Sequence, residues 1–158
     1  MYKIKSDNSL LISSRRNPLV RRLKKIASEP GKNEYSMLLL EGTHLLEEAL
    51  KTNFLPLEII VTPSWKRKNF NILESISNHT KIIEVTESVL EAALSTVHPD
   101  GVASLYPLSG LPLIPKNANF VLALDRLQDP GNLGNLFRTA LAADVELLWI
   151  ASGVNPLN

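Results

Sequence analysis

Short apolar blocks alternate with amphipathic stretches along most of the chain, and this alternation predicts strands interleaved with helices. The apolar blocks expected to form strands are residues 35–40, 57–61, 81–85, 102–106, 120–124 and 145–151. The stretches expected to form helices begin at Pro18 and then cover 43–51, 64–78, 88–94 and 132–143. The pattern therefore predicts an α/β fold.

Polar residues stand where several of these helices should begin. Asn17 precedes Pro18, a pair that suits an N-cap followed by the first helical position. Ser88 and Glu91 have the spacing of a capping box. Asn132 is expected to cap the helix that follows Gly131.

Residues that break regular structure cluster after position 106, at Pro107, Gly110, Pro112 and Pro115. Such a cluster is typical of a linker between domains. We expect a first domain over residues 1–107, a linker over 108–118 and part of a second domain over 119–158. The strand, helix and strand of this last segment are expected to form one right-handed βαβ unit.

Composition limits the classes of protein and site. The 158 residues carry a net charge of only +1 and contain no cysteine, which excludes a disulfide framework, a thiolate metal site and a cysteine nucleophile. No window approaches the ~20 apolar residues of a membrane span. We expect a cytoplasmic protein that uses neither a membrane nor a metal.

The positive charge is concentrated on the first helix. Six cations occur within eleven positions, namely Arg15, Arg16, Arg21, Arg22, Lys24 and Lys25. One interpretation is a solvated helix face, the usual fate of a charge run. The other is a surface that contacts the phosphates of RNA. The sequence leaves both open.

A second candidate site follows the strand at 120–124. Asn132, Gly134 and Arg138 should lie near the carboxyl end of that strand, where open α/β sheets bind ligands, and the amides at a helix N-terminus attract anions. Asn132 could instead serve only as a cap, and Arg138 only as an ion-pair partner of Asp125 or Asp129. A nucleotide-binding α/β protein is a weaker alternative, because the turn lacks Gly-x-Gly-x-x-Gly and a P-loop lysine.

The segment Asn132-Leu133-Gly134-Asn135-Leu136-Phe137-Arg138 resembles the first signature motif, Asn-x-Gly-x-x-x-Arg, of the SpoU/TrmH-type RNA ribose methyltransferases. Three other blocks resemble the same family in the same order: Arg16-Asn17-Pro18 before the basic helix, Glu41-Gly42-Thr43-His44 between strand and helix, and Pro99-Asp100-Gly101-Val102-Ala103. The resemblance covers most of the chain. We assign no catalytic role to His44.

The resemblance implies an N-terminal L30e-like α/β domain that binds RNA, joined to the first βαβ part of a SPOUT (α/β knot) Rossmann-like methyltransferase domain. Such enzymes are usually homodimers that move the methyl group of S-adenosylmethionine onto a ribose 2′-oxygen of rRNA or tRNA, without a metal. Arg138 and Asn132 match the catalytic motif. Because a guanidinium keeps its proton in proteins, phosphate positioning and oxyanion stabilisation suit Arg138 better than general-base catalysis.

The chain departs from the family pattern at two places. Asp144 stands where the helix and strand are usually joined through a glycine. The second and third motifs of the family, which hold the cofactor, are expected beyond Asn158. We therefore expect this chain alone to be inactive and not to bind S-adenosylmethionine. The alternative is a non-catalytic L30e-like RNA-binding protein.

Overall fold

The computed structural model describes residues 11–28, 34–76, 79–111 and 114–153. The chain divides into two compact units, Met1–Leu111 and Pro112–Asn158. Both units combine helices with sheet, so the α/β class predicted from the hydrophobic pattern is confirmed. No helix among the described residues is long and apolar enough to cross a membrane.

The first unit contains most of the regular elements. Its helices are α1 (Pro18–Ala27), α3 (Thr43–Lys51), α4 (Pro63–Lys68), α5 (Phe70–Glu74) and α6 (Glu87–Ala93), with a 3-10 turn, η1 (Leu108–Gly110). Its strands are β1 (Met37–Glu41), β2 (Glu58–Val61), β3 (Lys81–Glu84) and β4 (Val102–Pro107). They form one sheet in the order β1-β4-β2-β3. β4 is antiparallel to both of its neighbours, whereas β2 and β3 are parallel.

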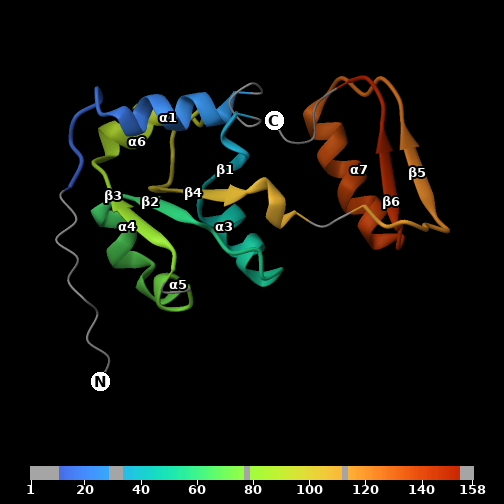
Figure 1. The fold of residues 1–158 in the computed structure, drawn as a ribbon, viewed down its shortest axis with the longest axis horizontal. Coiled ribbons are helices and arrows are strands. Elements are labelled where there is room, and N and C mark those ends of the chain that lie inside the picture. The colour runs from blue at the N-terminus through green and yellow to red at the C-terminus, as the bar shows by residue number, and fades with distance from the viewer. Residues whose placement is uncertain (1–10, 29–33, 77–78, 112–113, 154–158) are drawn as a thin grey trace. The chain divides into compact units, whose positions relative to one another are not determined.

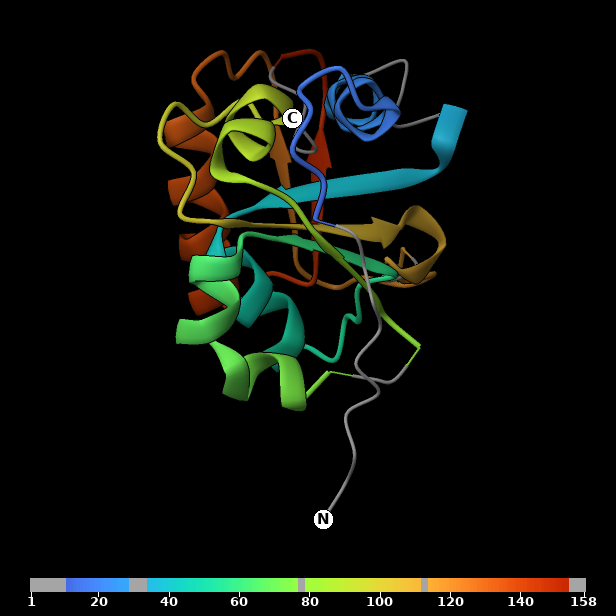
Figure 2. The ribbon, with the colours of Figure 1, turned by 90° about the vertical axis from the view of Figure 1, so that its left-hand side faces the viewer.

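Helices cover both faces of this sheet, α1 and α6 on one side and α3, α4 and α5 on the other (Figure 1). The view along the sheet in Figure 2 shows the same separation. Side chains alternate between the two layers, as strand geometry requires. Ile60 packs with Leu23 of α1, whereas its neighbours Ile59 and Val61 pack with Leu46 of α3. Burial on both faces explains why the strands read as continuous apolar blocks.

The first helix agrees with its prediction. The side chain of Asn17 accepts a hydrogen bond from the Leu19 amide at 2.9 Å, and Pro18 occupies the first helical position. Leu23 and Ile26, on the face expected to point inward, are each 1% exposed. Local sequence signals were sufficient here because the cap and the hydrophobic face lie within ten consecutive residues.

Other helices differ from their predictions. The helix expected over 64–78 is two short helices that meet at Asn69, and residues 77–78 lie outside the described part. Thr86, not Ser88, is the N-cap of α6, and Ser88 lies within the helix. These ends depend on contacts with other elements, which a local pattern does not contain.

The second unit consists of β5 (Val121–Leu124), α7 (Pro130–Ala142) and β6 (Leu147–Ile150). The two strands pair in parallel, so a helix connects them as the expected βαβ unit requires. α7 lies along one face of the pair (Figure 1) and buries Leu133 and Ala140. The other face exposes Val121 and Trp149.

Leu141 and Asp144, near the C-terminal end of α7, are both exposed. Leu141 is 79% exposed, so this apolar side chain is not part of the buried side of α7. Asp144 has a φ of +54°, a conformation that glycine adopts most easily and that aspartate tolerates better than most residues. The turn geometry is therefore the physical reason why a glycine would suit this position.

Candidate functional site

The turn that follows β5 is held in place by Asp129. Its side chain is the N-cap of α7 and accepts a hydrogen bond from the Asn132 amide at 2.6 Å. The interpretation of Asn132 as the cap is therefore wrong, because the helix begins two residues earlier, at Pro130. The side chain of Asn132 is left exposed and available for another partner.

The loops after β5 and β6 approach each other closely at the carboxyl edge of the parallel pair. A Cβ added to Gly153, whose φ is +152°, would come within 2.4 Å of the carbonyl oxygen of Leu127. The Ala151 amide donates a hydrogen bond to the carbonyl oxygen of Leu124 at 2.8 Å, so the pairing of the two strands continues to their ends. The first turn of α7 leaves this edge directly, so Asn132 lies beside it.

Arg138 lies further along α7, about 9 Å from Asn132 along the helix axis and a third of a turn around it. The structure therefore places these two candidate residues on one helix without bringing their side chains into contact. Arg138 is exposed, and its Nη1 donates to Oδ1 of Asn135 at 3.5 Å. This pair and Gly134 share one face of α7.

The acidic partners considered for Arg138 are engaged elsewhere. Asp125 pairs with Arg126 at 3.5 Å, and Asp129 caps the helix. Among the described residues, the guanidinium of Arg138 makes no ion pair. The salt-bridge interpretation of Arg138 is therefore wrong for this structure. A charged fork with five donors and no acidic partner is suited to bind a phosphate or an oxyanion.

Gly134 lies on the same face of α7, and the space beside it is not filled by other described residues. A Cβ at Gly134 would meet no atom within 4 Å, and the residue has no unusual φ. Neither packing within the unit nor turn geometry therefore requires a glycine at this position. Glycine in a helix interior is less favourable than alanine by up to about 1 kcal/mol.

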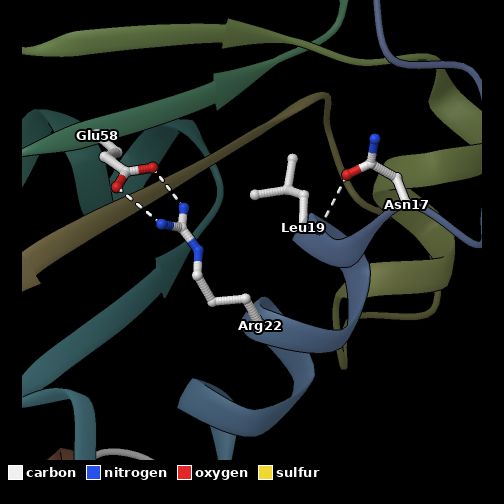
Figure 3. Close-up of polar contacts among 4 residues, drawn as sticks. All are labelled: Asn17, Leu19, Arg22 and Glu58. Carbon is white, nitrogen blue, oxygen red and sulfur yellow. Dashed lines mark hydrogen bonds and ion pairs between the residues drawn. The ribbon is translucent and has the colours of Figure 1, made fainter.

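The basic face of α1 forms the second candidate site, and its six cations differ in their surroundings. Both terminal nitrogens of Arg22 donate to the carboxylate of Glu58, at the start of β2 (Figure 3). This Arg22 side chain is 32% exposed and its partner only 14%. Arg22 therefore joins α1 to the sheet, and its guanidinium is engaged by this contact.

Two other cations of the segment also have partners. Arg15 donates from Nε to the Ser88 carbonyl at 3.1 Å, and its Nη2 lies 3.9 Å from Glu91. Lys25 donates to Glu34 at 2.6 Å. This hydrogen bond raises the pKa of Lys25 above its ordinary value.

The remaining three cations, Arg16, Arg21 and Lys24, are exposed and form no ion pair among the described residues. Arg21 and Lys24 are three positions apart, so they lie side by side on the outer surface of α1. A pattern of charges along the sequence could not separate these residues from Arg22, because the partner of Arg22 is 36 positions away. The free cations define a smaller surface than the sequence predicted.

A third cluster joins two motifs that lie far apart in the sequence. The carboxylate of Glu41 accepts hydrogen bonds from the backbone amides and hydroxyl groups of Ser95 and Thr96, at 2.6–3.0 Å. The Thr43 amide donates to Asp100 at 2.8 Å. These contacts fasten the loop between α6 and β4 to the end of β1 and to the start of α3. Sequence reasoning recognised these motifs but not this role, and His44 is exposed beside them.

The hydrogen bonds of Glu41 predict that the free energy of unfolding depends on pH. Burial disfavours its ionised form, but the hydrogen bonds from Ser95 and Thr96 together outweigh this and hold the pKa of Glu41 below its ordinary value of 4.5. The stabilisation is therefore present above pH 4.5 and is lost as the pH falls through the lowered pKa. Glu41→Gln should cost about 1–2 kcal/mol of unfolding free energy at neutral pH, and this difference should disappear in acid.

Urea unfolding of the wild type and the variant at pH 7 and in acid measures this difference. Glu48→Gln is the matched control, because Glu48 pairs with Lys51 on an exposed surface and its loss should change stability little at either pH. An equal loss of stability from Glu41→Gln at both pH values would contradict the assignment.

The chain resembles a known family of substrate-binding domains and several curated proteins. A model of the MRM3-like substrate binding domain matches residues 17–104. Over 156 residues the chain is 38% identical to an uncharacterized tRNA/rRNA methyltransferase of Synechocystis sp., covering 96% of this chain and 56% of that protein. Over 142 residues it is 30% identical to the 23S rRNA (guanosine(2553)-2′-O)-methyltransferase RlmP of Bacillus subtilis, covering 90% and 54%. The chain thus spans about half the length of these relatives.

Solved structures have the same fold. An RNA 2′-O ribose methyltransferase superposes with a TM-score of 0.72 at 24% identity, over 94% of this chain and 58% of that one. An AdoMet-bound rRNA methyltransferase from Sinorhizobium meliloti superposes with a TM-score of 0.72 at 23% identity, over 92% and 56%. At these identities the likeness concerns the fold.

Proposed function

The chain belongs to the family of MRM3-like substrate-binding domains, and from this premise we propose that it is part of an RNA 2′-O-methyltransferase. The enzyme would transfer the methyl group of S-adenosylmethionine to a ribose 2′-oxygen of rRNA or tRNA in the cytoplasm. The resemblance to SpoU/TrmH proteins read from the sequence is confirmed by relatives that carry tRNA/rRNA methyltransferase names. We further propose that the enzyme works as a homodimer.

The observation that carries this proposal is the combination of two sites in one chain. The first unit contains the matched substrate-binding segment with three unpaired cations on α1. The second unit presents Asn132 and Arg138 on α7, and both side chains are exposed. The cations of α1 suit the phosphates of a bound RNA, and the two residues of α7 suit the ribose that reacts.

We assign an L30e-like fold to residues 1–107, a linker to 108–118 and the beginning of a SPOUT methyltransferase domain to 119–158. The mixed four-stranded sheet with helices on both faces supports the first assignment. The division of the chain after Leu111 supports a boundary in this region, although residues 112–113 lie outside the described part. The parallel pair β5-β6 with its crossover helix supports the last assignment.

The residues at the carboxyl edge of β5 and β6 fit one wall of a cofactor site. The loops 125–129 and 151–153 meet there, and their backbones come so close at Gly153 that a side chain would not fit. Open α/β sheets bind ligands at this place. S-adenosylmethionine, when bound, supplies an electrophilic methyl group on a sulfonium. The described residues provide the surface beside it and the groups that act on the RNA.

The RNA hydroxyl is the difficult reactant, because a ribose hydroxyl keeps its proton at neutral pH. A group near the site must hold the ribose in position and stabilise the charge that develops on its oxygen. Arg138 suits this role because its guanidinium is charged and exposed and has no acidic partner in the described part of the chain. Asn132 offers a neutral amide about one and two-thirds turns earlier on the same helix, which can orient a hydroxyl or a phosphate oxygen.

The activity is tested with the full-length protein, labelled S-adenosylmethionine and a mixture of rRNA and tRNA. Label should enter the RNA, and digestion should yield a 2′-O-methylated nucleoside. Label on a base, or none with either RNA, would overturn the proposed reaction.

The proposed RNA surface makes a separate prediction about salt dependence. Reversing Arg21 and Lys24 to glutamate should weaken RNA binding and lower the slope of log affinity against log salt by roughly 0.7–0.9 for each lost phosphate contact. Reversal of Arg67 and Lys68, two exposed cations of α4 on the opposite face of the sheet, is the matched control. A titration of each variant at several salt concentrations measures the slopes. Equal slope losses in both variants would show that α1 has no special role.

A further inference from the structure

An exposed aromatic ring stands at the C-terminal end of the basic helix. Tyr35 has helical backbone just before the turn at Ser36 that leads into β1, and it is 40% exposed. The Nζ atom of Lys25 is 5.6 Å from the centroid of its ring. The sequence predicts Tyr35 within a buried strand over 35–40, but the strand begins at Met37, so the ring is left outside the sheet.

The backbone around this ring is fixed by neighbouring contacts. Ser36 has a φ of +51°, which turns the chain sharply between Tyr35 and the strand. The carbonyl of Ser36 accepts a hydrogen bond from the Leu108 amide at 2.9 Å, so the turn is tied to the end of β4. Because the backbone next to Tyr35 is already held in place, less freedom is lost there when the side chain binds a partner.

Charge differs along the surface from α1 to Tyr35. Arg21 and Lys24 have no acidic partner among the described residues, so they can attract phosphate. Lys25, whose Nζ lies over one face of the Tyr35 ring, is paired with Glu34 at 2.6 Å, and this ion pair offsets its charge. The surface therefore offers positive charge first and then a neutral aromatic face. A nucleotide presents the matching pair, an anionic phosphate and a base with a π-face.

We propose that Tyr35 stacks against an unpaired base of the RNA whose phosphates contact Arg21 and Lys24. This inference rests on the proposed RNA-binding function and specifies the substrate as RNA with a single-stranded or looped segment at this place. The bases of a continuous RNA duplex are stacked on one another, and their faces are not available to a protein side chain. Stacking on Tyr35 therefore requires an unpaired base, whereas the cations contact the phosphates of single-stranded and duplex RNA alike.

The test measures the binding of a fluorescein-labelled oligoadenylate of about twelve nucleotides, and of a blunt duplex of the same length, to the full-length protein. Tyr35→Ala should weaken single-strand binding on the order of 10-fold and leave the salt slope unchanged, because no charge is removed. Tyr35→Phe should bind like the wild type, because it keeps the ring. Duplex binding should be the same for all three proteins.

Phe70→Ala is the matched control, since Phe70 is 41% exposed on α5, on the opposite face of the sheet. It should leave single-strand binding unchanged. Circular dichroism of each variant verifies that the fold is retained.

The possible outcomes separate this inference from the function on which it rests. If the Arg21 and Lys24 reversal weakens binding while Tyr35→Ala does not, stacking is overturned and the RNA surface stands. If neither variant weakens binding, the RNA surface of α1 is itself overturned. An equal loss of duplex binding in Tyr35→Ala would also overturn stacking, as would a changed salt slope or an affinity loss in Tyr35→Phe.

Discussion

Arg138→Ala in the full-length protein is expected to slow methyl transfer on the order of 10²-fold or more while leaving the fold intact. This is the scale of loss when one preorganised donor to a transition-state charge is removed. The fold should tolerate the change because Arg138 is exposed and its hydrogen bond in the described structure is a 3.5 Å contact with Asn135. Single-turnover methylation and thermal unfolding of the same variant measure the two effects.

Two further variants sharpen this test. Arg138→Lys should restore activity poorly, because an ammonium does not reproduce the planar fork that contacts two oxygens together. Lys116→Ala removes an exposed cation elsewhere in the same unit and should leave the rate unchanged. A destabilised Arg138→Ala protein with a normal rate in its folded fraction would show that the arginine has a structural role.

Gly101→Ala is expected to lower the unfolding free energy by about 2–5 kcal/mol. Gly101 has a φ of +106°, which costs an L-residue about 1–2 kcal/mol. The added Cβ would also lie 2.8 Å from Cβ of Trp65 and 2.9 Å from Oγ1 of Thr62, both in a buried layer. Overpacking of this kind costs typically 1–3 kcal/mol more. Such a loss is a large part of the stability of a domain.

Gly42→Ala is the matched control for Gly101→Ala. Gly42 has a similar φ of +100°, but the nearest atom to its added Cβ is 3.7 Å away, on the carboxylate of Asp100. It should therefore lose only the backbone part, about 1–2 kcal/mol. Urea unfolding followed by Trp65 fluorescence, in a Trp149→Phe background, compares the two variants. Equal losses would mean that the contact with Trp65 and Thr62 relaxes without cost.

The amino-acid sequence was sufficient for features that depend on neighbouring residues. Asn17 and Pro18 begin α1 as predicted, because cap and helix are adjacent along the chain. The alternation of apolar blocks and amphipathic stretches identified the strands to within a few residues, since burial on both faces of a sheet requires continuous apolar runs. The signature motifs also indicated the family, because the residue types and their order are written directly in the sequence.

Tertiary structure decided which polar groups are free. Arg22 and Arg21 are adjacent and alike in sequence, yet Arg22 is engaged by Glu58 while Arg21 is exposed. Likewise, Arg138 forms no ion pair with any described residue, whereas Asp125 contacts Arg126 and Asp129 caps α7. A charged side chain's partner is set by whichever group the fold brings near it, and this distance in space is not encoded in local spacing.

The same reason applies to Tyr35. Its type and its apolar neighbours favour a buried strand, but β1 begins at Met37, where its pairing with β4 begins. A strand ends where its partner ends, and β4 is more than sixty residues away in the chain. The sequence alone therefore determined the elements and the chemistry that they carry. The assembled sheet decided which of those side chains face outward, because only packing between distant segments covers one residue and exposes the next.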